Sequence, residues 1–136
     1  MKKVLFLVLS LLLVLSGCSQ TTQTPPPVEN TPAENTYQQI SQEEAKEMMD
    51  NQDVIILDVR EQDEFDSGHI PGADLLPVGT ITEDTAAAVI PETDSVVLVY
   101  CRSGNRSKVA SQALADLGYT NVYEFGGINT WPYEVE

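Results

Sequence analysis

Two short apolar runs constrain the fold of this chain more than any other feature. Residues 54–57 read Val-Ile-Ile-Leu, and residues 96–100 read Val-Val-Leu-Val-Tyr. Uninterrupted runs rich in β-branched residues are typical of strands that are buried on both faces of a parallel sheet. Parallel strands need long crossover connections, which are usually helical. The sequence therefore predicts an α/β fold with a mainly parallel central sheet flanked by helices.

The segments around these runs carry helix and turn signals. Ser41-Gln42-Glu43-Glu44 has the pattern of a capping box and predicts a helix that runs to about Asn51. Short helices are expected over 61–67 and 82–90, and a weaker strand over 73–76. Strands that alternate with helices through short links support the α/β prediction.

A longer helix is predicted over 106–117. Its apolar residues follow helical spacing: Val109, Ala110, Ala113, Leu114 and Leu117. Gly118 is expected to cap its end, and 122–125 reads as the last strand. No internal repeat is visible.

The first 18 residues have the pattern of a secretory signal peptide. Lys2 and Lys3 precede an apolar run over 4–15, which is shorter than the roughly 20 residues that span a bilayer. The run ends in Leu15-Ser16-Gly17-Cys18, which resembles the lipobox of bacterial lipoproteins. The resemblance implies that residues 1–17 are removed and that Cys18 carries lipid, including palmitate. The alternative is ordinary cleavage nearby that leaves Cys18 as a free thiol.

Residues 19–36 are almost entirely polar residues and proline. Such a segment buries too little apolar surface to fold, so 18–36 is interpreted as the lipidated cysteine and a disordered tether. The chain is then expected to be held at the cell membrane by its lipid, on the extracytoplasmic side, either periplasmic or on the outer surface.

The charge of the chain excludes several classes of function. Acidic residues number 21 against seven Lys and Arg, and five of those seven remain without the signal peptide, a net charge of −16. A surface this acidic repels phosphate backbones, so nucleic-acid binding is not expected. Two cysteines and one histidine also exclude a four-thiolate zinc site and a histidine-rich metal centre.

The segment over 101–107, Cys-Arg-Ser-Gly-Asn-Arg-Ser, follows the second apolar run and precedes the long helix. A loop in this place can direct backbone N–H groups at the Cys101 sulfur and lower the thiol pKa from about 8.5 into the range of about 3.5–7.5. Three of the five remaining basic residues, Arg102, Arg106 and Lys108, lie in or beside this loop. Cys101 is therefore the candidate nucleophile, and its substrate is expected to be anionic.

Several motifs together resemble a rhodanese domain across nearly all of residues 37–136. They are Leu57-Asp58-Val59-Arg60-Glu61, Glu64-Phe65, Gly68-His69-Ile70-Pro71-Gly72-Ala73, the loop 101–107, Gly126-Gly127-Ile128 and Trp131-Pro132. The resemblance implies a single rhodanese-like domain and a thiosulfate sulfurtransferase. Cys101 would attack the outer sulfur of thiosulfate, release sulfite as it becomes a persulfide, and pass the sulfur to cyanide or a thiol. It implies no metal and no organic cofactor, and we expect a monomer.

The positions and charges of other residues predict their roles around Cys101. The substrate would be bound by the loop residues Arg102, Ser103, Gly104, Asn105 and Arg106. Asp58 and Arg60 follow the first buried strand and are expected at the same sheet edge, where a structural ion pair is favoured over a direct role in the pocket. His69 is expected to hydrogen-bond a turn rather than to act as a base, and Trp131 to pack in the core.

Two alternatives remain open. Protein tyrosine phosphatases have a larger loop, Cys-x5-Arg, and arsenate reductases also have a larger one, whereas this chain has Cys-x4-Arg between Cys101 and Arg106. A phosphatase or arsenate reductase is therefore less favoured. The second alternative is a non-catalytic module whose loop binds an anion or an acidic segment of a partner.

Overall fold

Five parallel strands form the sheet of the computed structural model, which describes residues 35–136. The predicted signal peptide, Cys18 and tether residues 19–34 lie outside the described residues. The strand order is β1-β5-β4-β2-β3, and every neighbouring pair is parallel. The bounds are β1 Gln38–Gln39, β2 Ile55–Asp58, β3 Ala73–Leu75, β4 Val96–Cys101 and β5 Asn121–Gly127. The predicted α/β fold with a parallel sheet is confirmed.

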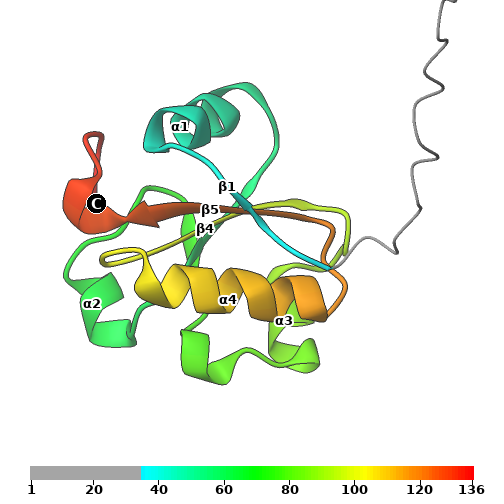
Figure 1. Ribbon diagram of the computed structural model, residues 1–136. Helices are drawn as coiled ribbons and strands as arrows, with labels where there is room; N and C mark the ends of the chain where they lie inside the picture. Colours follow the sequence, from blue (N-terminus) through cyan, green and yellow to red (C-terminus); the bar gives the residue numbers. More distant parts are fainter. Residues whose placement is uncertain (1–34) are drawn as a thin grey trace, which may run out of the picture.

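Helices cover both faces of this sheet. The bounds are α1 Gln42–Asn51, α2 Gln62–Asp66, α3 Glu83–Val89 and α4 Asn105–Asp116, with single 3-10 turns at η1 Val78–Thr80 and η2 Ile128–Thr130. Figure 1 shows α1 on one face, α3 and α4 on the other, and α2 beside the edge at which β5 and β4 end. Within residues 35–136 no helix is long and apolar enough to cross a membrane.

The core is split into two layers by the sheet. Strand β4 supplies both, because successive side chains point to opposite faces of a strand. Val97, Val99 and Cys101 pack with buried residues of α3 and α4, whereas Leu98 and Tyr100 pack with the α1 side. The cysteine sulfur therefore lies on the face that α4 covers.

Most predicted elements are present within one or two residues of their expected bounds. The capping box of α1 is confirmed, since the Ser41 hydroxyl accepts from the Glu44 N–H and the Glu44 carboxylate accepts from the Ser41 N–H. Strand β1 was not predicted; its two residues, both exposed, carry no apolar pattern.

The predicted apolar face of the last helix is partly wrong. Val109 is 63% exposed, and the residues that α4 buries are Ser107, Ala110, Ser111, Leu114 and Ala115. Small side chains allow α4 to lie close to the sheet. The buried stripe is therefore made of alanine and serine as much as of larger apolar residues.

A bulge at the end of β5 shapes the edge where the site lies. Val99 of β4 pairs with Glu124, but Cys101 pairs with Gly127, so β5 has one extra residue between these pairs. Gly126 takes up the extra length with a φ of +96°, a conformation that glycine adopts without strain. Bulges of this kind re-aim side chains next to functional sites.

Candidate active site

Cys101 is the last residue of β4 and lies beneath the loop that leads into α4. Its side chain is buried, with 1% exposure. The backbone N–H of Gly104 donates a hydrogen bond to Sγ over 3.1 Å. Gly104 has a φ of +96° and stands immediately before the first residue of α4, so the loop turns back over the sulfur at this glycine. The sulfur thus lies at the positive end of a helix.

The surroundings of Cys101 favour its thiolate. Burial by itself raises the pKa of the thiol, but hydrogen bonds from the Ser107 hydroxyl and from the N–H groups of Ser107, Gly104 and Ser103 outweigh it. The pKa of Cys101 is therefore lowered from its ordinary value. A thiolate is the nucleophilic form of cysteine, so this arrangement favours the form in which Cys101 could act as a nucleophile.

Ser107 and Glu124 continue the hydrogen bonds of the site below the sulfur. Ser107 Oγ lies 3.5 Å from the Cys101 sulfur and donates to Glu124 Oε1 over 2.6 Å. Both side chains are buried. No role was predicted for either residue from the sequence. The signal that could have identified Glu124 is a carboxylate within the otherwise apolar run 122–125, which was predicted as the last strand.

The loop is held against the sheet by Gly127. A Cβ at this position would lie 2.2 Å from the Arg102 carbonyl oxygen and 2.6 Å from the Ser103 Cα. The Arg102 carbonyl also accepts a hydrogen bond from the Asn129 N–H over 3.2 Å. Only glycine permits this close approach of the Arg102 and Ser103 backbone to the end of β5.

The predicted substrate-binding residues surround Cys101 on the same loop. Arg102, Ser103 and Asn105 are exposed, while Gly104 is buried against Gly126. The Arg102 guanidinium makes no ion pair with an acidic residue in the part of the chain that the structure describes.

Arg106 is arranged differently from Arg102. Its guanidinium donates to both carboxylate oxygens of Glu64, over 2.6 and 2.8 Å. Arg106 lowers the pKa of Glu64 to about 2. Glu64 in turn raises the pKa of Arg106, with a smaller contribution from Cys101. The pair connects α2 with the first turn of α4 beside the sulfur.

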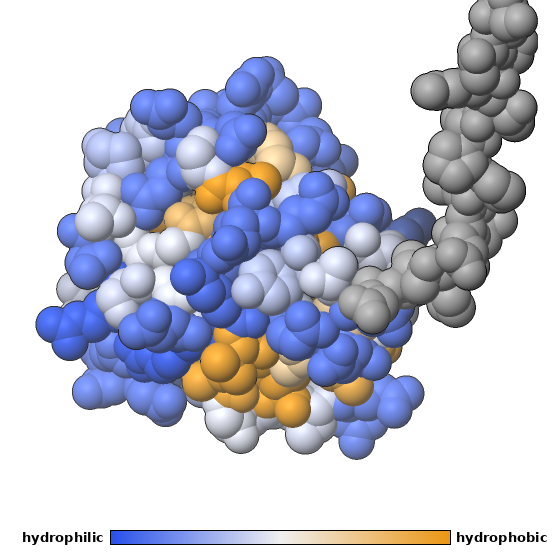
Figure 2. Space-filling model, viewed as in Figure 1, coloured by the Kyte–Doolittle hydropathy of each residue, from blue (hydrophilic) through white to orange (hydrophobic). Residues whose placement is uncertain are grey.

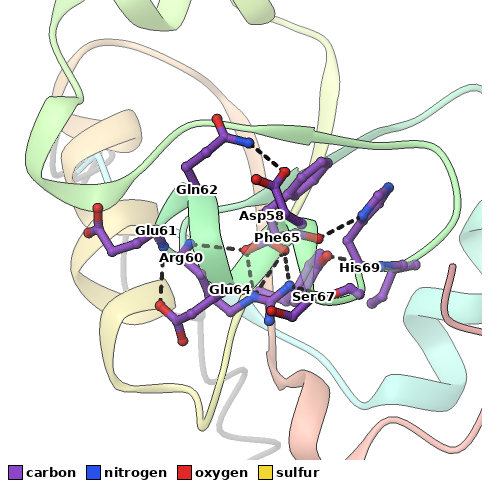
Figure 3. Close-up of polar contacts among 12 residues, drawn as sticks. Asp58, Arg60, Glu61, Gln62, Glu64, Phe65, Ser67 and His69 are labelled. Carbon is purple, nitrogen blue, oxygen red and sulfur yellow. Dashed lines mark hydrogen bonds and ion pairs between the residues drawn. The ribbon is translucent and has the colours of Figure 1, made fainter.

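Asp58 and Arg60 form a buried ion pair at the end of β2. Arg60 donates from Nε to Asp58 Oδ1 over 2.9 Å and from Nη2 to Oδ2 over 2.6 Å, and its Nη2 also reaches the Gly68 carbonyl. Figure 3 shows this pair beside residues 61–67 of the α2 segment. The guanidinium lies over the ring of Tyr100, 5.8 Å from its centroid. Tyr100 belongs to the core layer on the α1 side of the sheet, opposite Cys101. The ion pair therefore lies at the expected edge of the sheet, but it packs against the face that does not hold the Cys101 sulfur.

His69 is occupied by contacts with the end of α2 and the chain terminus. Its Nδ1 lies 3.0 Å from the Phe65 carbonyl, and its ring stacks on that of Phe65. Figure 3 draws the contact between this ring and the Phe65 carbonyl. Its backbone is paired with Glu136. Trp131 is buried and packs against Phe125, in the core layer under α1.

Comparisons with known proteins place this geometry in a family. Residues 41–133 match the family model of the rhodanese-like domain. The thiosulfate sulfurtransferase GlpE of Coxiella burnetii is 38% identical over 96 residues, which are 70% of this chain and 87% of that protein. The thiosulfate sulfurtransferase PspE of Escherichia coli is 36% identical over 72 residues, 53% of this chain and 68% of that protein.

Solved structures show the same fold, and the N-terminus has a match of its own. A rhodanese with anions from E. coli has a TM-score of 0.58 at 27% identity over 62% of this chain and 98% of that one. A rhodanese-like domain from Anabaena has a TM-score of 0.66 at 26% identity over 72% and 77% of the two chains. Residues 1–19 match the prokaryotic membrane lipoprotein lipid attachment site. Fold, loop and sequence agree, and the chain belongs to the rhodanese-like domain family.

Proposed function

We propose that this domain is a sulfurtransferase that moves a sulfane sulfur from thiosulfate, or a similar anionic donor, to a thiol or cyanide. The observation that carries the proposal is the position of the Cys101 sulfur, which accepts a hydrogen bond from the Gly104 N–H at the start of α4. Hydrogen bonds to the sulfur lower the pKa of Cys101, which increases its share of the nucleophilic thiolate. The names of the relatives, thiosulfate sulfurtransferases, support the choice of donor.

The chemical steps follow from a nucleophilic sulfur in an anion-binding loop. The Cys101 thiolate attacks the outer sulfur of the donor, and the electron pair of the broken S–S bond leaves with sulfite. The persulfide then lies under the loop, where the N–H groups of residues 102–106 and the Arg102 guanidinium favour its negative charge. A thiophilic acceptor attacks the outer sulfur and releases Cys101.

The second part of the proposal concerns where this reaction takes place. The N-terminal match to a lipid attachment site supports a lipid on Cys18. Two or more acyl chains would hold the domain stably at the membrane, outside the cytoplasm. We therefore propose a membrane-anchored, extracytoplasmic sulfurtransferase of a bacterium that acts on small sulfur compounds.

The experiment uses the full-length chain in detergent micelles, reduced and then incubated with thiosulfate. Mass spectrometry of the peptide that contains Cys101 is expected to show one added sulfur, about 32 Da, which cyanide then removes. The Cys101→Ser variant should gain no sulfur, whereas Cys18→Ser, which replaces the other cysteine, should keep the gain at Cys101. A folded, reduced protein that never forms this adduct would contradict the proposed function.

A further inference from the structure

Glu124 is a buried carboxylate next to the reactive cysteine. It lies on β5 with 3% exposure, on the face of the sheet that α4 covers. Its oxygens accept three hydrogen bonds: Oε1 from Ser107 Oγ over 2.6 Å and from the Gly126 N–H over 2.9 Å, and Oε2 from Gln39 Nε2 over 3.1 Å. A buried carboxylate without a cation is costly, so this placement calls for a reason.

Among residues 35–136, no Lys or Arg forms an ion pair with Glu124, and Lys108 of the neighbouring helix α4 is exposed. Strand β1 contributes the neutral amide of Gln39, and α4 contributes the Ser107 hydroxyl. Arg106, also on α4, is paired with Glu64 instead. None of the ion pairs among residues 35–136 includes Glu124. The titratable group that reaches it through a hydrogen-bond chain is Cys101, on β4.

Ser107 connects these two acidic groups with a single hydroxyl proton. Its Oγ lies 3.5 Å from the Cys101 sulfur and 2.6 Å from Glu124 Oε1, with the Gly126 carbonyl a more distant acceptor at 3.4 Å. A serine hydroxyl can donate to one of them and accept from the other. If sulfur and carboxylate were both ionised, two buried negative charges would lie close together and compete for the one Ser107 hydroxyl proton, which is unfavourable although each also accepts other hydrogen bonds. One proton is therefore expected to be shared along the chain from Sγ through Oγ to Oε1.

We propose that Glu124, acting through Ser107, takes up the proton of Cys101 during sulfur transfer, an inference that rests on the proposed function. The Sγ–H proton moves to Ser107 Oγ while the Ser107 proton moves to Glu124 Oε1. The charge of the group stays at −1, now on the sulfur, which attacks the donor. When the acceptor removes the outer sulfur, the released thiolate recovers a proton by the reverse path. Glu124 does not contact the sulfur and acts only through Ser107, so it is a positioning residue that controls where the shared proton lies.

The test is the pH dependence of Cys101 alkylation by iodoacetamide, an uncharged probe that needs no sulfur donor. The full-length chain in micelles is compared with Glu124→Gln and Ser107→Ala, and the Cys101 peptide is quantified by mass spectrometry. The unaltered chain should react at a nearly constant rate across mildly acidic to neutral pH, because its thiolate forms without losing a proton to solvent. Each variant should slow about tenfold per pH unit below the titration of its thiol, and match the unaltered chain within about twofold at alkaline pH.

Glu47→Gln is the matched control, because it removes one exposed carboxylate of α1 and should leave the profile unchanged. An equal deficit at every pH would overturn the proposal by showing a structural role only. Faster alkylation of Glu124→Gln at acidic pH would also overturn it, since Glu124 would then be only a repelling charge. Ser107→Ala keeps the carboxylate and provides the test if Glu124→Gln does not fold.

The two proposals can fail separately. A pH profile that depends on Glu124, with no persulfide from thiosulfate, would retain the shared proton and reject the sulfurtransferase. A persulfide together with identical alkylation profiles in all chains would retain the sulfurtransferase and reject the shared proton.

Discussion

At the scale of single residues, the two arginines of the loop have different surroundings. Arg102 is exposed and has no ion pair with an acidic residue of the described part of the chain, whereas Arg106 donates from both of its terminal nitrogens to Glu64. The bidentate pair with Glu64 holds the Arg106 guanidinium in place, and the carboxylate offsets much of the positive charge that would otherwise attract an anion. We therefore expect Arg106 to stabilise the start of α4, and the exposed Arg102 to be the arginine that meets an anionic substrate.

The Glu64→Gln substitution tests this division. Gln can still accept from the Glu61 N–H but loses the charge that pairs with Arg106. Because the pKa of Glu64 is lowered from 4.5 to about 2 in the folded state, the pair stabilises the fold above about pH 4.5 and loses this effect as the pH falls toward 2. At neutral pH the variant should be less stable by about 1 kcal/mol, a value kept small because both side chains are partly exposed.

Urea unfolding of both chains across acidic and neutral pH measures this difference. The gap between them should close as Glu64 becomes protonated. A gap that stays constant down to the acid limit would show that the ion pair is not its source.

At the scale of elements, the site depends on how closely the loop after β4 approaches the end of β5. Gly127 permits that approach. Its φ of −133° is open to any residue, so a side chain is excluded only because its Cβ would clash with the loop. The atoms in the way belong to the backbone of Arg102 and Ser103 and cannot rotate aside. The loop that covers Cys101 is therefore positioned by backbone packing.

Gly127→Ala should displace this loop. Overpacking of this kind is expected to destabilise the domain by about 3 kcal/mol in urea unfolding and to slow alkylation of Cys101 as the loop amides move. Gly79→Ala is the control, since a Cβ at Gly79 meets nothing within 4 Å. That change should leave stability the same or raise it by up to about 1 kcal/mol. Wild-type reactivity in Gly127→Ala would disprove the positioning role.

The sequence predicted those elements and site residues whose signals are local. The runs that became β2 and β4, the capping box of α1 and the loop at Cys101 are read from neighbouring residues. The Glu64 and Glu124 contacts were not predicted, because they join residues 42 and 17 positions apart. The bulge that separates the Glu124 and Gly127 pairings depends on strand register, which a single run does not encode.

At the scale of the whole molecule, negative charge dominates the surface. Two of the 21 acidic residues, Glu29 and Glu34, precede the described residues, which leaves 19 acidic against five basic residues. Within residues 35–136, Lys and Arg form close ion pairs only with Asp50, Asp58 and Glu64. Figure 2 shows a mostly hydrophilic surface in this view, with an apolar patch beside α3. Most carboxylates therefore repel one another across the domain.

Moderate salt should consequently stabilise the fold. Screening weakens three ion pairs with Lys or Arg but relieves the repulsion among the many remaining carboxylates, and the second effect should prevail. Going from low to about 0.15 M sodium chloride should raise stability by about 1 kcal/mol, or Tm by about 5 °C. The gain should largely vanish near pH ~4, where many carboxylates are protonated. A Tm that falls with salt at neutral pH would mean that the paired charges outweigh the unpaired ones.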